Sequence, residues 1–288
     1  MTLEHHFLNL GAGVQSTALY LMSIDGDEPL VPRFDAAIFA DTQEEPDEVY
    51  RHLEWLEKQG GPPVIRTTAG SLGKALEEGC DAAGNKLRDG GHFISIPAYT
   101  LLPTGEKGIS QRQCTADFKI KPIEKWIRES LGVQPGRPVS KDHAIVQYMG
   151  LSFDEPKRVI RVKQRYMAKP SNWIAKFPLW EMEYTRGDCQ AYLRGRMPYE
   201  VPRSACVFCP FKSDEEWRRL RDDDPAGWDR AVYIDKVCRR SGTFKAERFV
   251  HKSCQPLDKV DLRPADEKSG QKHLFSGFQD ECEGYCGN

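Results

Sequence analysis

The feature that most constrains this fold is an alternation of short apolar runs and helix-patterned segments along the first half of the chain. An apolar run at 6–10 ends in a glycine-rich turn, and residues 14–24 then place apolar side chains at helical spacing. A near-continuous apolar run at 34–40 is typical of a strand buried on both faces of a parallel sheet. Strands that alternate with helices predict an α/β fold with a doubly wound parallel sheet and right-handed crossovers.

The same patterns locate the remaining elements. We expect further strands at 64–67 and 144–149, and helices at 46–56, 71–78, 122–131, 186–194, 213–221 and 225–239. Ser213 and Glu216 form a capping box at the start of one of these helices. Residues 80–112 have no clear period and are expected to form a loop insertion or lid. We divide the chain into a nucleotide-binding α/β domain over 1–180 and a helical, cysteine-rich C-terminal extension over 181–288 that closes over the site.

Composition and the N-terminus limit the setting of the chain. With 39% hydrophobic and 29% charged residues it has ordinary globular composition, and no apolar run approaches the roughly 18 residues of a membrane helix. Residues 1–6 lack a signal-peptide pattern, so we expect a soluble, cytoplasmic protein with no membrane partner. In a reducing compartment, clustered cysteines are more typical of metal ligands or redox thiols than of disulfides. The nine cysteines are Cys80, Cys114, Cys189, Cys206, Cys209, Cys238, Cys254, Cys282 and Cys286.

Charge is spread unevenly along the chain. Residues 118–169 contain twelve Lys and Arg against five Asp and Glu, although the formal net charge of the whole chain is −2. A basic segment in an otherwise acidic protein indicates a face for nucleotide phosphates or a polynucleotide backbone, the alternative being a solvated surface.

The glycine turn after the first strand is the first candidate site. In Gly11-Ala12-Gly13, small residues let backbone N–H groups approach an anion, and Ser16 and Thr17 add hydroxyl donors at the start of the helix. The segment matches neither the Rossmann GxGxxG nor the Walker GxxxxGK[ST] pattern, which argues against an ordinary dehydrogenase or P-loop NTPase. The alternative is a tight strand-to-helix connection without a ligand.

The second candidate is Asp41-Thr42, at the end of the second strand. Ligands of open α/β sheets gather at the carboxyl ends of the strands, so a carboxylate there can hold Mg²⁺ or a ribose. The alternative is that Asp41 or Thr42 caps the following helix, although Asp41 lies early for that role.

Together these motifs resemble the PP-loop ATP pyrophosphatases (adenine nucleotide alpha-hydrolase-like superfamily), and within them the phosphoadenylylsulfate (PAPS) reductase branch, including its uncharacterised phage and bacterial members. That family has an SGGxDS-like loop after its first strand and a DTGxE-like motif after its second. Here Gln15 stands at the acidic position of the loop and Gln43 at the glycine of the second motif. The resemblance implies that Gly11, Ala12, Gly13, Gln15, Ser16, Thr17, Asp41 and Thr42 bind an adenine nucleotide, either ATP with Mg²⁺ or PAPS.

Two further segments extend the resemblance. The segment from Cys114 to Ile123 is similar to the CCxxRKVxPL segment of adenylylsulfate reductases, in which Lys119 matches the lysine. We expect Lys119 and Lys121 to act in catalysis by neutralising negative charge. Thr115 stands where the second cysteine of that segment would be. Residues 150–158 resemble the fourth-strand motif of the family, which implies that Gly150, Ser152 and Arg158 contact phosphate or sulfate.

Cys206-Val-Phe-Cys209-Pro places two thiols within reach of one metal ion or cluster. Adenylylsulfate reductases use such a pair, with upstream cysteines, to hold a [4Fe–4S] cluster, so the resemblance implies that Cys114, Cys206 and Cys209 are three ligands. The fourth ligand is open, and we consider Cys282 or Cys286 first, then Cys189, Cys238, Cys254, or no protein ligand. A zinc site and a thioredoxin-like redox pair are the alternatives.

The chain ends in Glu281-Cys282-Glu-Gly-Tyr-Cys286-Gly-Asn. PAPS and adenylylsulfate reductases end in an ECG-like tail whose cysteine attacks sulfur, so the resemblance implies a catalytic role for Cys282 or Cys286. A mobile terminal thiol suits sulfur relay, because it can enter a closed site and leave again. The alternative is a structural or metal-binding tail.

Our leading hypothesis is an enzyme that adenylates an acceptor with ATP, releases pyrophosphate and inserts sulfur from an iron–sulfur cluster or a tail persulfide. A nucleic acid or nucleobase acceptor fits the basic segment, and a sulfur-donor protein is an expected partner. The alternative is a PAPS or adenylylsulfate reductase that makes sulfite with thioredoxin as reductant. A third hypothesis is a zinc-stabilised nucleic-acid-binding module. The sequence leaves room for a homodimer.

Overall fold

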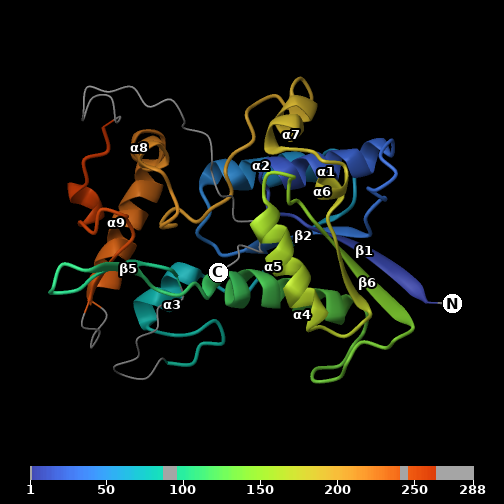
Figure 1. Ribbon diagram of the computed structural model, residues 1–288, viewed down its shortest axis with the longest axis horizontal. Coiled ribbons are helices and arrows are strands. Elements are labelled where there is room, and N and C mark those ends of the chain that lie inside the picture. The colour runs from blue at the N-terminus through green and yellow to red at the C-terminus, as the bar shows by residue number, and fades with distance from the viewer. Residues whose placement is uncertain (1, 87–95, 241–245, 264–288) are drawn as a thin grey trace.

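The computed structural model describes residues 2–86, 96–240 and 246–263 (Figure 1). Its centre is a five-stranded sheet in the order β3-β2-β1-β6-β7, in which every neighbouring pair is parallel. The strands are β1 (Leu3–Asn9), β2 (Ala36–Asp41), β3 (Val64–Thr68), β6 (His143–Met149) and β7 (Trp173–Lys176). The chain runs outward from β1 through β2 to β3 and then returns to the other side of β1. The predicted α/β class and parallel sheet are confirmed, with an order compatible with double winding.

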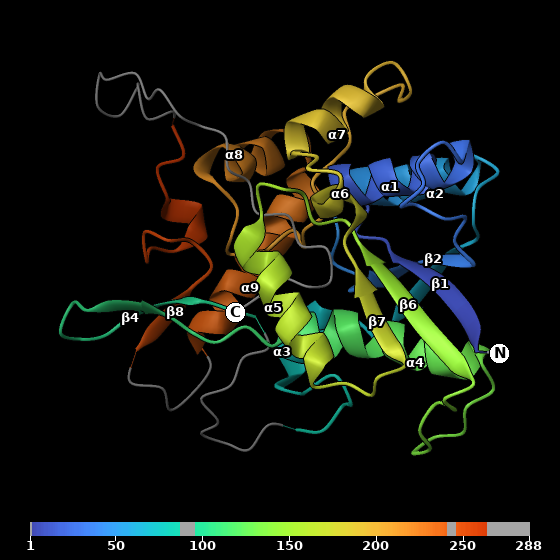
Figure 2. The same cartoon turned by 45° about the vertical axis from the view of Figure 1, so that its right-hand side comes forward.

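Helices cover both faces of this sheet (Figure 2). One face packs against α1 (Val14–Asp25), α2 (Asp47–Glu57), α6 (Pro178–Glu181) and α7 (Arg186–Leu193). The other packs against α4 (Lys121–Ser130) and α5 (Pro156–Met167). Alternate residues of the central strands serve the two cores: Leu8 faces the first and Phe7 the second. We call the sheet with these six helices the sheet body.

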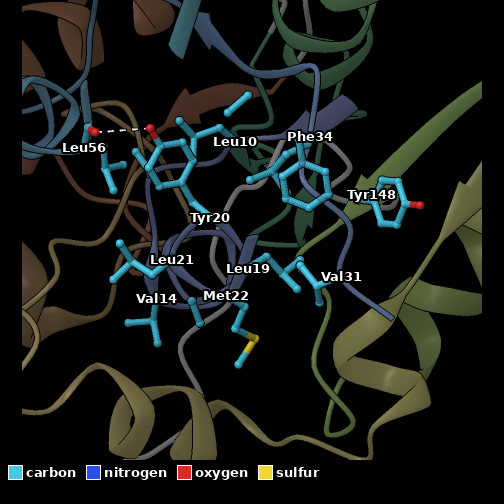
Figure 3. Packing of buried hydrophobic residues seen from close by; sticks show 14 of the residues in the cluster. Leu10, Val14, Leu19, Tyr20, Leu21, Met22, Val31, Phe34, Leu56 and Tyr148 are labelled. Carbon is cyan, nitrogen blue, oxygen red and sulfur yellow. Dashed lines mark hydrogen bonds between the residues drawn. The ribbon is translucent and has the colours of Figure 1, made fainter. Parts of the chain in front are cut away.

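The first core forms around α1, which is buried along most of its length (Figure 3). Tyr20 reaches across to α2, where its hydroxyl donates to the carbonyls of Leu56 at 3.2 Å and Pro62 at 2.9 Å. The helix ends at Gly26, whose φ of 73° is the left-handed conformation that glycine adopts without strain. A helix this apolar is held by packing on all sides, which fixes the start of α1 against the sheet edge.

A third core lies beside the sheet body and contains α3 (Leu72–Glu78), the π-helix η1 (Thr115–Ile120), α8 (Asp214–Asp223) and α9 (Pro225–Arg240). A small antiparallel sheet, ordered β5-β4-β8, accompanies it: β4 (Tyr99–Leu101), β5 (Lys107–Ile109) and β8 (Glu247–Phe249). The short 3₁₀ helix η2 (Leu257–Lys259) follows. Figure 1 shows this group on the left of the view and the main sheet on the right.

The prediction of a structureless 80–112 segment was therefore wrong in part, because β4 and β5 form a hairpin there. Three-residue strands are too short to show an alternating pattern, and the outer partner β8 lies far along the chain. The structure also contains α5, α6 and β7, which we did not predict. The predicted helices were found, and the capping box is confirmed: Ser213 Oγ accepts from the Glu216 N–H at 3.2 Å, and Glu216 accepts from the Ser213 N–H at 2.6 Å.

Within the described residues, no helix combines the length and the apolar character needed to cross a membrane. The division at residue 180 stays a prediction, as does the cysteine-rich extension, much of which lies outside the described residues.

Candidate functional site

The carboxyl ends of β1, β2 and β6 meet at one edge of the sheet. The segments that follow these strands are the three that we singled out from the sequence: 11–17, 41–45 and 150–158. The strand order reverses between β1 and β6, and in open α/β sheets ligands bind in the crevice at such a switch point. The fold therefore gathers the predicted nucleotide-binding residues at the edge where such ligands bind.

The glycine turn is buried and compact. Ala12 has a φ of 56°, and the N–H groups of Gly11 and Gly13 both approach Ser16 Oγ, at 3.2 and 3.3 Å. An anion held by these two N–H groups would take the place of the Ser16 hydroxyl. The Thr17 hydroxyl points elsewhere, since its Oγ1 lies 2.8 Å from His52 Nε2 inside the first core.

Side chains from the turns after β1 and β6 bond across the switch point. Gln15 Nε2 donates to Ser152 Oγ at 3.3 Å and to Glu155 Oε2 at 3.2 Å. Arg186, at the start of α7, donates to Gln15 Oε1 at 3.1 Å, and Arg158 forms an ion pair with Glu155. The amide of Gln15 therefore links the turn after β1 to the turn after β6. An acidic residue at this position would be repelled by the Glu155 carboxylate.

Asp41 is held by two donors at the end of β2. Its Oδ1 accepts from the Gln43 N–H at 2.7 Å and from the Tyr50 hydroxyl at 3.0 Å. Burial and the adjacent Asp41 carboxylate raise the pKa of Tyr50. Gln43 has a φ of 60°, so both it and Ala12 adopt the left-handed conformation at positions where the PP-loop pattern has glycine.

Three predicted ligands, Cys114, Cys206 and Cys209, line one small cavity between the sheet edge and the third core. The cavity measures about 20 Å³ and is also lined by Thr42 and Lys119, among others. Cys206 Sγ lies 3.2 Å from Thr42 Oγ1, and burial raises the pKa of the Cys206 thiol well above its usual value. We call this the thiol cavity. It joins residues that are about 90 positions apart in the sequence.

The donors of the thiol cavity suit a soft metal centre, because thiolates are the preferred ligands of zinc and of iron–sulfur clusters. A volume of about 20 Å³ holds about one water molecule, so the cavity would have to widen to hold a four-iron cluster. No set of three or more His, Cys, Asp or Glu residues among those described is arranged to hold a metal ion. The three thiols therefore line the same cavity but do not form a closed coordination shell.

The other cysteines take different places. Cys189 packs in the first core, Cys238 is a buried residue of α9, and Cys254 is buried beside β4. None of these three lines the thiol cavity. Burial raises the pKa of Cys238 to about 12, as expected for an inert thiol. Cys80 is also buried. Cys282 and Cys286 lie outside the described residues, so their predicted roles stay predictions.

The two predicted catalytic lysines differ. Lys119 Nζ lies 3.2 Å from Glu45 Oε1 in a buried ion pair, and Ser204 Oγ donates to the other oxygen of Glu45 at 3.2 Å. Lys121 is exposed and pairs with Asp117, one turn earlier, at 2.5 Å. The structure therefore brings Lys119, and not Lys121, to the thiol cavity.

A second, larger pocket was not predicted. It has a volume of about 780 Å³ and lies between the start of α2, the start of α7, the segment 200–212 and α8. Its lining is mostly charged and includes Arg186, Arg203, Lys212 and Glu216. We call this the polar pocket. No sequence motif marked Arg186, Arg203 or Lys212, because they lie in separate segments and each resembles an ordinary surface charge; Glu216 was marked only as part of the helix cap.

No protein-family model matches this chain, and no curated protein matches its sequence. The resemblance to PP-loop enzymes therefore rests on the sequence motifs alone.

Proposed function

We propose that this protein is an adenylating sulfur-transfer enzyme of the PP-loop type, with a thiolate-ligated metal centre beside its nucleotide site. The observation that carries the proposal is the thiol cavity: three thiols from two distant segments meet Thr42 and Lys119 at the edge where a parallel sheet binds nucleotides. A structural zinc site would not need to lie at this edge, whereas sulfur transfer to an adenylated acceptor requires the two sites to be adjacent.

The reaction has two balanced steps. A carbonyl oxygen of the acceptor attacks the α-phosphorus of ATP, and the bond to pyrophosphate breaks. Hydrosulfide then adds at the activated carbon, and AMP departs with the original oxygen while a proton is lost. When bound, the metal centre supplies the hydrosulfide; the chain's own residues bind, orient and neutralise charge.

Those residues are the ones at the sheet edge. The N–H groups of Gly11 and Gly13 and the start of α1 face the phosphates, where the helix dipole favours negative charge. Lys119, held by Glu45, places a cation between the sheet edge and the thiols, where negative charge develops as AMP leaves. Asp41, fixed by Tyr50, is positioned to hold Mg²⁺ or the ribose.

A nucleic acid acceptor is supported by the surface of α5. Four of its basic residues, Lys157, Arg161, Lys163 and Arg165, are exposed, and this helix flanks the switch point. Exposed cations on one helix suit a phosphate backbone.

Metal content after anaerobic purification tests the first half of this proposal. We expect about four iron and four sulfide per chain, lost in Cys114→Ser and in Cys206→Ser and kept in Cys189→Ala, whose thiol packs in the first core. Stoichiometric zinc without sulfide would contradict sulfur transfer and favour the zinc-stabilised binding module.

Product analysis tests the second half. With bulk transfer RNA or DNA as acceptor, we expect pyrophosphate from ATP and no sulfite from PAPS. Sulfite from PAPS with a thioredoxin reductant, and no pyrophosphate from ATP, would make the protein a sulfonucleotide reductase instead.

A further inference from the structure

The polar pocket contains a buried lysine whose amino group lacks a hydrogen-bond or ion-pair partner among the described residues. Lys212 lines the pocket with only 8% of its surface exposed. Its amino group lies over the ring of Trp217, 6.0 Å from the ring centroid. A lysine buried to this extent is normally paired, because removing a charge from water without compensation is unfavourable.

The nearest acidic group of the pocket does not supply the missing charge. Glu216 forms an ion pair with Arg203 and accepts the Ser213 N–H at 2.6 Å. Burial acts to raise the pKa of Glu216, but the charge of Arg203 and the Ser213 N–H outweigh it, so the pKa is lowered. Glu216 is thus already paired with Arg203, and no ion pair joins it to Lys212 in the described part of the chain.

Two other cations of the pocket are engaged within the protein: Arg219 bonds Glu48 at 3.1 Å between α2 and α8, and Arg186 bonds Gln15. Arg51 lines the pocket from the exposed surface of α2. Lys212 is the buried cation of the lining, and we therefore place an incoming negative charge at its amino group. Both views place α2, α7 and α8 on the same side of the molecule (Figures 1 and 2).

Size and lining narrow the class of ligand. A volume of about 780 Å³ is that of a small-molecule site, and the lining contains carboxylates such as Asp47, Glu200 and Asp224 that accept hydrogen bonds from hydroxyl groups. A purely apolar ligand would leave these groups unpaired, and a bare inorganic anion would leave most of the pocket unfilled.

We propose that the polar pocket binds a phosphomonoester with a hydroxyl-rich body, either a nucleotide or a sugar phosphate, whose phosphate pairs with Lys212. This site is separate from the glycine turn and from the thiol cavity, and it does not depend on the identity of the metal. The loop from Cys206 to Lys212 connects it to the thiols, since the Lys212 N–H donates to the Cys209 carbonyl at 3.2 Å.

The test combines binding with stability. Ribose 5-phosphate, AMP and adenosine are titrated by calorimetry into the full chain and into Lys212→Met, with Lys236→Met, an exposed lysine of α9, as the matched control. We expect at least one phosphomonoester to bind, adenosine to bind at least about tenfold more weakly, and Lys212→Met to lose at least about tenfold in affinity. AMP is also expected to bind at the sheet edge, so only the AMP binding that Lys212→Met removes is assigned to the polar pocket. If that binding is tighter than the binding of ribose 5-phosphate, the pocket is a nucleotide site; if the two are equal, it is a sugar phosphate site.

Thermal unfolding gives the second measurement. Because Lys212→Met removes an uncompensated buried charge, it should raise the melting temperature without ligand and abolish the stabilisation that the phosphomonoester produces. Lys236→Met should change neither. The proposal is overturned if neither phosphomonoester binds the unaltered chain up to about 10 mM, if Lys212→Met binds them equally well, or if it lowers the melting temperature without ligand. Each of these results leaves the sulfur-transfer proposal as it stands.

Discussion

The sheet body and the third core are assembled in different ways. In the sheet body, three of the four strand pairs (β1 with β2, β2 with β3, and β6 with β7) join strands that follow one another along the chain, and only β1 with β6 brings distant strands together. The third core instead combines three distant stretches, 72–82, 96–118 and 205–262. Its helices are short or strongly charged, and they are held by a few buried polar anchors as well as by apolar packing.

The candidate site lies at the boundary between the sheet body and the third core, which we call the seam, and the two modes of assembly explain this position. The segment 42–45 leaves the sheet body and enters the third core, where the Val207 N–H donates to the Glu44 carbonyl at 2.7 Å. The sheet body thus contributes the edge that we propose binds a nucleotide, and the third core contributes the thiols. Single-residue variants in the sheet body or in the third core should therefore show how much each region contributes to stability.

The largest effect on stability is expected at Glu44, the main polar anchor across the seam. Its carboxylate accepts from Arg230 at 2.7 and 3.0 Å, from Ser71 Oγ at 2.8 Å and from the Gly73 N–H at 3.0 Å. Glu44→Ala leaves these donors unpaired and should lower the free energy of unfolding by about 3–5 kcal/mol. Denaturant unfolding measures this loss, and limited proteolysis should show cleavage in the third core first.

Glu48→Ala is the matched control, because the pair of Glu48 with Arg219 crosses the same seam but is exposed. We expect that variant to cost about 1 kcal/mol or less. Equal losses in the two variants would show that Glu44 does not anchor the third core.

The next effect is confined to the sheet body and depends on pH. Burial lowers the pKa of His52 from 6.5 to about 4, so between these values the unfolded chain binds a proton that the folded chain does not. Stability should therefore fall as the pH decreases from about 6.5 to 4, by about 3 kcal/mol in all. His52→Gln should flatten this part of the profile, measured by denaturant unfolding at each pH.

Tyr199→Phe is the control for the cause of this effect. It removes the hydrogen-bond partner of His52 Nδ1, at 3.1 Å, and leaves the histidine in the core. Because burial is the cause of the shift, the pH dependence should persist in Tyr199→Phe. A flat profile in that variant would assign the effect to the hydrogen bond instead.

The smallest effects are expected at two matching helix caps. Ser213 and Glu216 cap α8 in the third core, whereas Thr185 and Asp188 form the same reciprocal pair at α7 in the sheet body. Ser213→Ala and Thr185→Ala should each cost about 1 kcal/mol. Hydrogen exchange should show faster exchange in α8 for the first variant and in α7 for the second; uniform acceleration in both would mean that the two regions unfold as one unit.

Much of the sheet body could be predicted because its information is local. The apolar runs, the glycine turn and the proline before α2 each indicate an element by themselves, and the edge residues follow from strand direction. The helix α5 was missed because its sequence, from Pro156 to Met167, is dominated by cations, with apolar contacts only at residues such as Val159 and Val162.

The third core could be predicted only in pieces. The capping box predicted α8, but nothing near residues 99–101 indicates a strand whose outer partner is 247–249. The pair of Cys206 and Cys209 was visible as a motif, and the resemblance supplied Cys114. The sequence did not single out Lys212, because its distinguishing property is three-dimensional: it is buried, and no hydrogen bond or ion pair engages its amino group among the described residues.

The pairing of β4 with β8 also has a consequence for the order of events during synthesis. Thr100 stands opposite Arg248 in this antiparallel pair, so about 150 residues must be made before it can form. By then all five strands of the main sheet, which ends with β7, have long been available to fold. Distant contacts of this kind form late, since a large loop must close first. The nascent chain therefore carries the thiols of the thiol cavity beside a third core that is completed only after β8 has been made.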